Sequence, residues 1–188
     1  RFKCDWSSDV CSSDLTKAGI HFSASQHTWS YLFTLDPSTM RIAKHAPRDA
    51  WIGNAFSLTP DGMTAAFVAS GPAEFPDVFV APVATMAGTK VSNAGTQIAS
   101  WPKHAREVFT WKSQDGATIE GVLHKPAGFQ AGRRYPLLIV IHGGPTAVSR
   151  PVPYSSTTTY PIDTYLAKGA IVLEPNYRGS AGYGEAFR

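Results

Sequence analysis

The sequence predicts two successive parts of different fold class: an antiparallel, strand-rich part over residues 16–107 and an α/β part with a parallel sheet over residues 108–188. In the first part, short runs of aromatic and β-branched residues alternate with turn signals, as is typical of antiparallel sheets. In the second part, an apolar strand, a helix and another apolar strand follow one another, which predicts a βαβ unit. The composition, 43% hydrophobic over 188 residues, is ordinary for a globular protein.

The first residues of the chain are set apart from the rest. Residues 5–15 back-translate to a string that resembles a widely used short-read sequencing adapter. We therefore expect residues 1–15 to be foreign to the natural protein and to make no structural contribution. A genuine loop rich in Ser and Asp is the alternative. Both cysteines, Cys4 and Cys11, lie in this segment, and their spacing without a partner histidine does not indicate a metal site.

Six short strands are expected between residues 16 and 107. The turn at Asp61-Gly62 is a strong hairpin signal, because both residue types tolerate the positive φ that such turns require. Aromatic and β-branched residues fill the strands, as a half-buried pleated surface favours. The expected strands are 19–25, 31–36, 40–44, 55–58, 63–69 and 77–82.

A weak internal repeat runs through this part. The stretch that begins at Phe22 resembles the stretch that begins at Phe67, at an offset of about 45 positions, which is the length of a four-stranded propeller blade. Two copies cannot close a ring, since propellers need about four to eight blades. A plain β-sandwich with chance similarity is the alternative.

The elements expected in the α/β part follow from its turn residues. Strands 109–113 and 119–124 flank a turn at 114–116 and form a hairpin. The apolar run 135–141 reads as a strand buried on both faces. Residues 161–168 read as a helix that ends at Gly169, and residues 170–175 as the next buried strand.

Two motifs follow these strands. The first strand leads into His142-Gly143-Gly144-Pro145, and the second is followed by a stretch that begins at Tyr177 and reads Tyr-Arg-Gly-Ser-Ala-Gly-Tyr-Gly. Together they resemble the prolyl oligopeptidase family of serine peptidases, in its acylaminoacyl-peptidase and dipeptidyl-peptidase-like branch. The resemblance implies the N-terminal part of an α/β-hydrolase domain over 108–188, preceded over 16–107 by the last strands of a β-propeller.

The resemblance also implies a chemistry, hydrolysis of peptide bonds by a Ser-Asp-His triad. Gly143 or Gly144 would supply an oxyanion-hole donor through its backbone N–H. No G-x-S-x-G occurs in the 188 residues. We therefore expect no catalytic residue in this chain and a triad beyond Arg188, so that the chain is an inactive fragment of the enzyme. The residues expected to shape the loops are His142, Pro145, Arg178 and Gly179.

Other functions remain open at this point. A carboxylic-ester hydrolase on the same fold and a non-enzymatic propeller binding module are the alternatives, since fold does not determine substrate. The glycines after residue 178 lack the spacing and the Lys-Ser/Thr ending of a phosphate loop. We expect a peptide substrate, no cofactor and no metal. The scattered charges, 17 basic and 14 acidic, argue against a nucleic-acid partner, and no apolar run is long enough for a membrane span.

Overall fold

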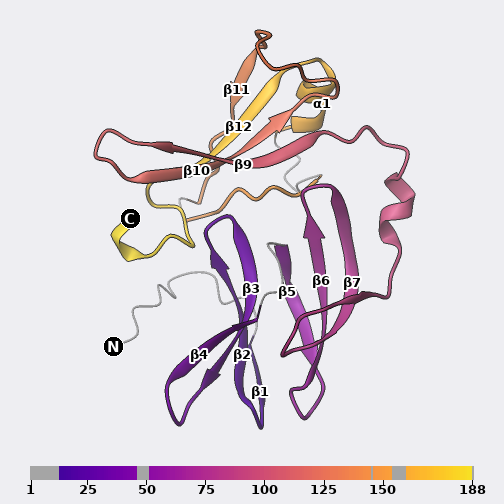
Figure 1. Ribbon diagram of the computed structural model, residues 1–188, viewed down its shortest axis with the longest axis vertical. Coiled ribbons are helices and arrows are strands. Elements are labelled where there is room, and N and C mark those ends of the chain that lie inside the picture. Colours follow the sequence, from indigo (N-terminus) through magenta and orange to yellow (C-terminus); the bar gives the residue numbers. More distant parts are fainter. Residues whose placement is uncertain (1–12, 46–50, 145, 154–159, 188) are drawn as a thin grey trace.

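A computed structural model describes residues 13–45, 51–144, 146–153 and 160–187. Two β-rich parts make up this structure (Figure 1). The first contains two strand meanders that lie side by side, and the second is a four-stranded sheet above them with one helix. Within the described residues, no helix is long and apolar enough to cross a membrane.

The first meander is antiparallel throughout. It consists of β1 (Ser13–Thr16), β2 (Gly19–Gln26), β3 (Trp29–Asp36) and β4 (Arg41–His45). The directly opposed pair Phe22 and Phe33 stacks across β2 and β3, with ring centroids 5.5 Å apart. Such cross-strand aromatic pairs stabilise a sheet beyond the area they bury.

The second meander repeats this arrangement. It consists of β5 (Trp51–Leu58), β6 (Thr64–Gly71), β7 (Glu74–Pro82) and the short β8 (Thr89–Lys90). The hairpin between β5 and β6 turns at Gly62, whose φ of +71° is the left-handed conformation that the Asp-Gly signal predicts. Phe22 and Phe67, which mark the internal repeat, occupy the second strands of the two meanders.

One hydrophobic core joins the two meanders. Among the described residues, the two meanders share one strand pairing, the parallel pair of Ser30 and Trp51. Leu32 of β3 is buried together with side chains of the second meander, so packing rather than hydrogen bonding holds the meanders together. The buried members of this core are Leu32, Ala65, Phe67, Ala69, Ala81, Val83 and Met86.

The second sheet follows a linker that contains a short 3-10 helix, η1 (Ala94–Ile98). Its strand order is β11 (Leu137–Ile139), β12 (Ile171–Asn176), β10 (Thr118–Lys125) and β9 (Ala105–Lys112). The expected hairpin is β9–β10, and β9 begins at Ala105, before the expected strand start at residue 109. The last element is a 3-10 turn, η2 (Glu185–Phe187).

The expected βαβ unit is present. Strands β11 and β12 are parallel, and α1 (Ile162–Ala167) connects them. The helix buries Ile162 and Leu166 against Val140 and Val172. Its end is followed by Gly169 at φ +84°, the left-handed conformation that glycine adopts after a helix.

One expectation for this sheet is wrong. The run 135–141 is not a strand buried on both faces, because the strand is only Leu137–Ile139 and one of its faces is open. Leu137, Ile139 and Ile141 are 56%, 58% and 61% exposed, whereas Val140 on the other face is 7% exposed. The physical reason is that α1 covers one face of β11, and no described residue covers the other.

The expectation for residues 1–15 is wrong in part. Residues 1–12 lie outside the described part of the chain. The backbone from Ser13 to Leu15 belongs to β1 and pairs with β2, where Ser13 faces Phe22 and Leu15 faces Ile20. The last residues of the suspect segment therefore contribute an edge strand of the first meander.

Candidate functional site

The loops that follow β11 and β12 meet at one edge of the second sheet. Because the two strands are parallel, their carboxyl ends lie at the same edge, where ligands of α/β sheets bind. The hydroxyl of Tyr177 donates a hydrogen bond of 2.7 Å to the carbonyl oxygen of His142. The rings of the two residues also stack, with centroids 4.6 Å apart. The two motifs found in the sequence are thus brought together.

His142 is held by both of its ring nitrogens. Nδ1 lies 3.1 Å from the carbonyl oxygen of Gly143, and Nε2 lies 2.9 Å from Oγ of Ser180, a residue only 1% exposed. One neutral tautomer satisfies both contacts, with Nδ1–H donating to the carbonyl and Nε2 accepting the serine hydroxyl. This geometry suits a residue that shapes the loop and does not suit a free general base.

The two glycines after His142 present their backbone to solvent. Within the described part of the chain, neither the Gly143 nor the Gly144 amide donates a hydrogen bond to another group. Gly144 has φ +121°, and a Cβ there would lie 3.0 Å from the backbone nitrogen of Ala147. A Cβ at Gly143 would meet nothing within 4 Å. The loop therefore requires glycine at 144 and leaves two amide donors for a ligand.

The other expected loop residues lie in the turn after β12. Gly179 has φ +96° and its amide donates to the carbonyl of Phe187 at 3.2 Å. The guanidinium of Arg178 forms an ion pair with Asp115 in the β9–β10 turn and lies 5.8 Å from the centre of the Phe187 ring. Arg178 therefore connects this turn to the neighbouring hairpin. Pro145 lies outside the described residues.

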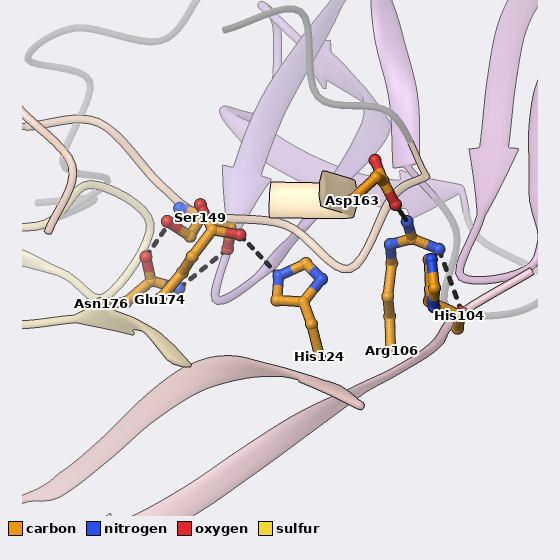
Figure 2. Close-up of polar contacts among 7 residues, drawn as sticks. All are labelled: His104, Arg106, His124, Ser149, Asp163, Glu174 and Asn176. Carbon is orange, nitrogen blue, oxygen red and sulfur yellow. Dashed lines mark hydrogen bonds and ion pairs between the residues drawn. The ribbon is translucent and has the colours of Figure 1, made fainter. Parts of the chain in front are cut away.

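Asn176 is a site residue that the sequence reasoning did not single out. Its side chain, at the end of β12, is fully buried, and Figure 2 shows it beside Ser149. Oδ1 accepts a hydrogen bond of 2.7 Å from the amide of Ser149, and Nδ2 donates one of 3.0 Å to the carbonyl of the same residue. We call residues 142–144 the glycine loop. Asn176 thus fixes the position of Ser149 in the segment that follows this loop. A polar amide side chain at the last position of a largely apolar strand is the signal that could have identified it.

A second polar cluster lies beside α1. The side chain of Arg106, only 3% exposed, pairs with Asp163 of the helix at 2.7 Å and donates to the carbonyl of His104 at 3.0 Å (Figure 2). The His124 ring nitrogen lies 2.6 Å from a carboxylate oxygen of Glu174. Burial lowers the pKa of His104, which favours its neutral form. These contacts connect β9 with α1 and β10 with β12.

Comparison with known proteins gives both sequence relatives and structural neighbours. No family model matches the chain. It is 36% identical over 81 residues to the uncharacterized peptidase YuxL of Bacillus subtilis. This match covers 43% of this chain and 12% of that protein. It is 31% identical over 81 residues to human dipeptidyl peptidase 8, with 43% of this chain and 9% of that protein covered.

The structural neighbours cover almost the whole chain. The Pyrococcus horikoshii acylaminoacyl peptidase superposes with a TM-score of 0.74 at 18% identity, covering 95% of this chain and 26% of that chain. An acylaminoacyl peptidase in complex with Z-Gly-Gly-Phe-chloromethyl ketone gives a TM-score of 0.75 at 18% identity, covering 97% and 27%. At this identity the likeness shows the fold. The matched segment of the chain spans only about a tenth of the length of the YuxL peptidase and of dipeptidyl peptidase 8.

Proposed function

We propose that this chain, whose sequence relatives and structural neighbours point to the prolyl oligopeptidase family of serine peptidases, is part of an enzyme that hydrolyses peptide bonds in oligopeptides. The observation that carries the proposal is the glycine loop at the carboxyl edge of β11 and β12. Its two amides are left open for a ligand, while the turn after β12 holds the loop in place.

In this proposal residues 16–107 are the C-terminal part of a β-propeller, and residues 108–188 are the N-terminal part of an α/β-hydrolase domain. Residues 1–15 are a foreign segment. Two antiparallel meanders support the propeller part, because strands β2, β3 and β4 of the first are arranged like β6, β7 and β8 of the second. The parallel pair β11 and β12 with α1 between them supports the hydrolase part.

The glycine loop would act as one side of an oxyanion hole. When a nucleophile attacks a peptide carbonyl, negative charge develops on the carbonyl oxygen, and an N–H of Gly143 or Gly144 stabilises it. Losing one such donor raises the barrier by about 2.7–4 kcal/mol. The residues that shape this loop and the turn opposite it are His142, Pro145, Arg178 and Gly179.

The reacting groups would come from other parts of the enzyme. No G-x-S-x-G occurs in these 188 residues, so the nucleophilic serine is proposed to lie outside them. There a serine attacks the carbonyl carbon, a histidine takes the serine proton and passes it to the leaving amine, and an aspartate orients the histidine. Water then attacks the acyl-enzyme. The histidine takes the proton of this water and returns a proton to the serine, and the acyl group leaves as a carboxylic acid.

The experiment that tests this function is hydrolysis by the longer protein that contains this chain. N-terminally blocked peptides, free peptides and simple esters are offered in parallel, and the products are identified by mass spectrometry. Cleavage of peptides in either set supports the proposal. Cleavage of esters alone would support an ester hydrolase, and cleavage of none of them would contradict an enzymatic function.

A further inference from the structure

A chain of polar contacts connects the glycine loop to the turn between β2 and β3. Asn176, which fastens Ser149, also donates through Nδ2 to the hydroxyl of Tyr183 at 3.2 Å. That hydroxyl donates to Oε2 of Glu120 at 2.9 Å. The other carboxylate oxygen, Oε1, lies 3.3 Å from Nδ1 of His27 in the β2–β3 turn. We call the set His27, Glu120, Tyr183 and Asn176 the relay.

The inner members of the relay are sheltered, whereas the side chain of His27 at its outer end is 57% exposed. Asn176 is fully buried, and the Glu120 side chain is 18% exposed. Burial and the neighbouring Glu120 carboxylate raise the pKa of Tyr183, so its hydroxyl keeps the proton that it donates. Hydrogen bonds to a charged carboxylate are stronger than those between neutral groups. The hydrogen bond from Tyr183 to Glu120 is therefore the strongest contact of the relay.

The backbone makes the same connection at closer range. The amide of His27 donates to the carbonyl of Gly182 at 2.8 Å, and the His27 ring meets the Tyr183 ring edge-on at 5.1 Å. A Cβ at Gly182 would lie 2.9 Å from the carbonyl oxygen of His27. Only glycine permits this close approach between the turn of the first part and the turn after β12.

A second route runs through Arg150, next to Ser149 in the chain. Its guanidinium donates to Oγ of Ser25 at 2.5 Å and to Oγ of Ser30 at 3.3 Å. These serines lie in β2 and β3, on either side of the same turn. The segment that continues the glycine loop is thus tied to the first part directly and through the relay.

We propose that the β2–β3 turn positions the glycine loop and residues 146–150 after it through the relay, so that order in these residues depends on contact between the two parts of the chain. The members of the relay are positioning residues and touch no reacting atom. Separation of the two parts removes the turn from Gly182 and Tyr183, and the loop loosens. The effect of the relay on catalysis rests on the proposed function. The effect of the relay on the order of the loop is independent of that function.

The test uses the longer protein and two variants that break the relay, Tyr183→Phe and Glu120→Ala. Hydrogen–deuterium exchange of peptides covering residues 137–150 reports loop order directly. We expect exchange there to be about three to ten times faster in both variants, as loss of a hydrogen bond predicts. In Glu120→Gln the acceptor for Tyr183 remains, and exchange should stay within about twofold of the unaltered protein.

The same variants are assayed for peptide hydrolysis. A misplaced oxyanion donor affects the transition state more than the bound substrate, so we expect kcat to fall about ten- to a hundredfold with little change in KM. Tyr160→Phe is the matched control, because this tyrosine is 49% exposed and lies next to α1. It should leave both kcat and loop exchange unchanged.

Two results would overturn the inference. One is unchanged exchange of residues 137–150 in both relay variants; the other is faster exchange spread evenly over the whole protein, which indicates a merely structural role. If the unaltered protein hydrolyses no peptide, the proposed function fails, and the exchange measurement still decides whether the relay orders the loop.

Discussion

The Tyr177 hydroxyl donates a hydrogen bond to the carbonyl oxygen of His142, and the rings of the two residues stack. Tyr177 lies just after β12 and His142 lies after β11, so each of two parallel strands contributes one half of this contact. The contact places the turn after β12 against the glycine loop after β11. The loop is therefore supported from the side, while its amides remain open.

The first prediction concerns this contact. Tyr177→Phe keeps the ring stack and removes the hydrogen bond to the partly buried carbonyl, so the free energy of unfolding should fall by about 1 kcal/mol. Urea unfolding of the longer protein that contains this chain, followed by tryptophan fluorescence, measures the change. Tyr160→Phe, at an exposed tyrosine, should change it by less than about 0.5 kcal/mol. Equal stability of both variants and the unaltered chain would show that the bond contributes nothing.

The second prediction concerns Gly143 in the longer enzyme. Gly143→Pro deletes the amide N–H, and if that N–H is the productive oxyanion donor, kcat should fall about 10²–10³-fold with little change in KM. Gly144→Pro tests the other amide less cleanly, because proline cannot adopt the φ of +121° found there. Steady-state kinetics on a peptide substrate make the measurement.

Gly143→Ala is the comparison for this variant. It keeps the N–H, and its added Cβ would meet nothing within 4 Å, so it should lose far less kcat than the proline variant. The oxyanion assignment is wrong if the proline variants at 143 and 144 both fold and keep full kcat.

The third prediction concerns pH. Burial raises the pKa of Asp77, but hydrogen bonds from Lys90 and Ser92 outweigh burial and lower the pKa from 3.8 to about 2. A carboxyl whose pKa is lower in the folded state stabilises the fold above its unfolded pKa. The contribution of Asp77 should therefore be complete above about pH 4 and be lost as the pH falls towards 2.

Asp77→Asn tests this sign. At pH 7 the unfolding temperature of this variant should lie below that of the unaltered protein. The difference in unfolding temperature between the two proteins should be smaller at pH 3. Glu107→Gln, at a side chain 50% exposed, is the control and should show a small gap at both values. A gap for Asp77→Asn that widens on acidification would contradict the pKa assignment.

The strands were predictable because each is a local pattern. The turn at Asp61-Gly62, the stop at Gly169 and the alternation of apolar residues each identify an element from its own few residues. The contacts of Asn176 and Glu120 were not predictable in this way. Glu120, Tyr183 and His27 belong to three separate segments of the chain, and no spacing in the sequence shows that these residues come together. Whether an apolar run such as 137–141 is covered on one face or two also depends on neighbours far away in the chain.

The fourth prediction concerns that open face. Leu137, Ile139 and Ile141 point to the same side of an edge strand, so the 188-residue chain alone should associate or be molten. Replacing Ile139 and Ile141 with threonine should reduce association, as measured by light scattering. Val78→Thr, at a valine 37% exposed on β7, should reduce it less. A clean monomer with one sharp unfolding transition from the unaltered chain would refute this prediction.

The central claim is that these residues supply an oxyanion loop to a serine peptidase whose nucleophile lies elsewhere in the enzyme. Covalent labelling with a fluorophosphonate probe, followed by peptide mapping, tests it most directly. We predict that the longer protein is labelled at one serine outside these 188 residues, and that the 188-residue chain alone is not labelled. Labelling at a serine within the chain, such as Ser180, or a complete absence of labelling in the longer protein, would contradict the claim.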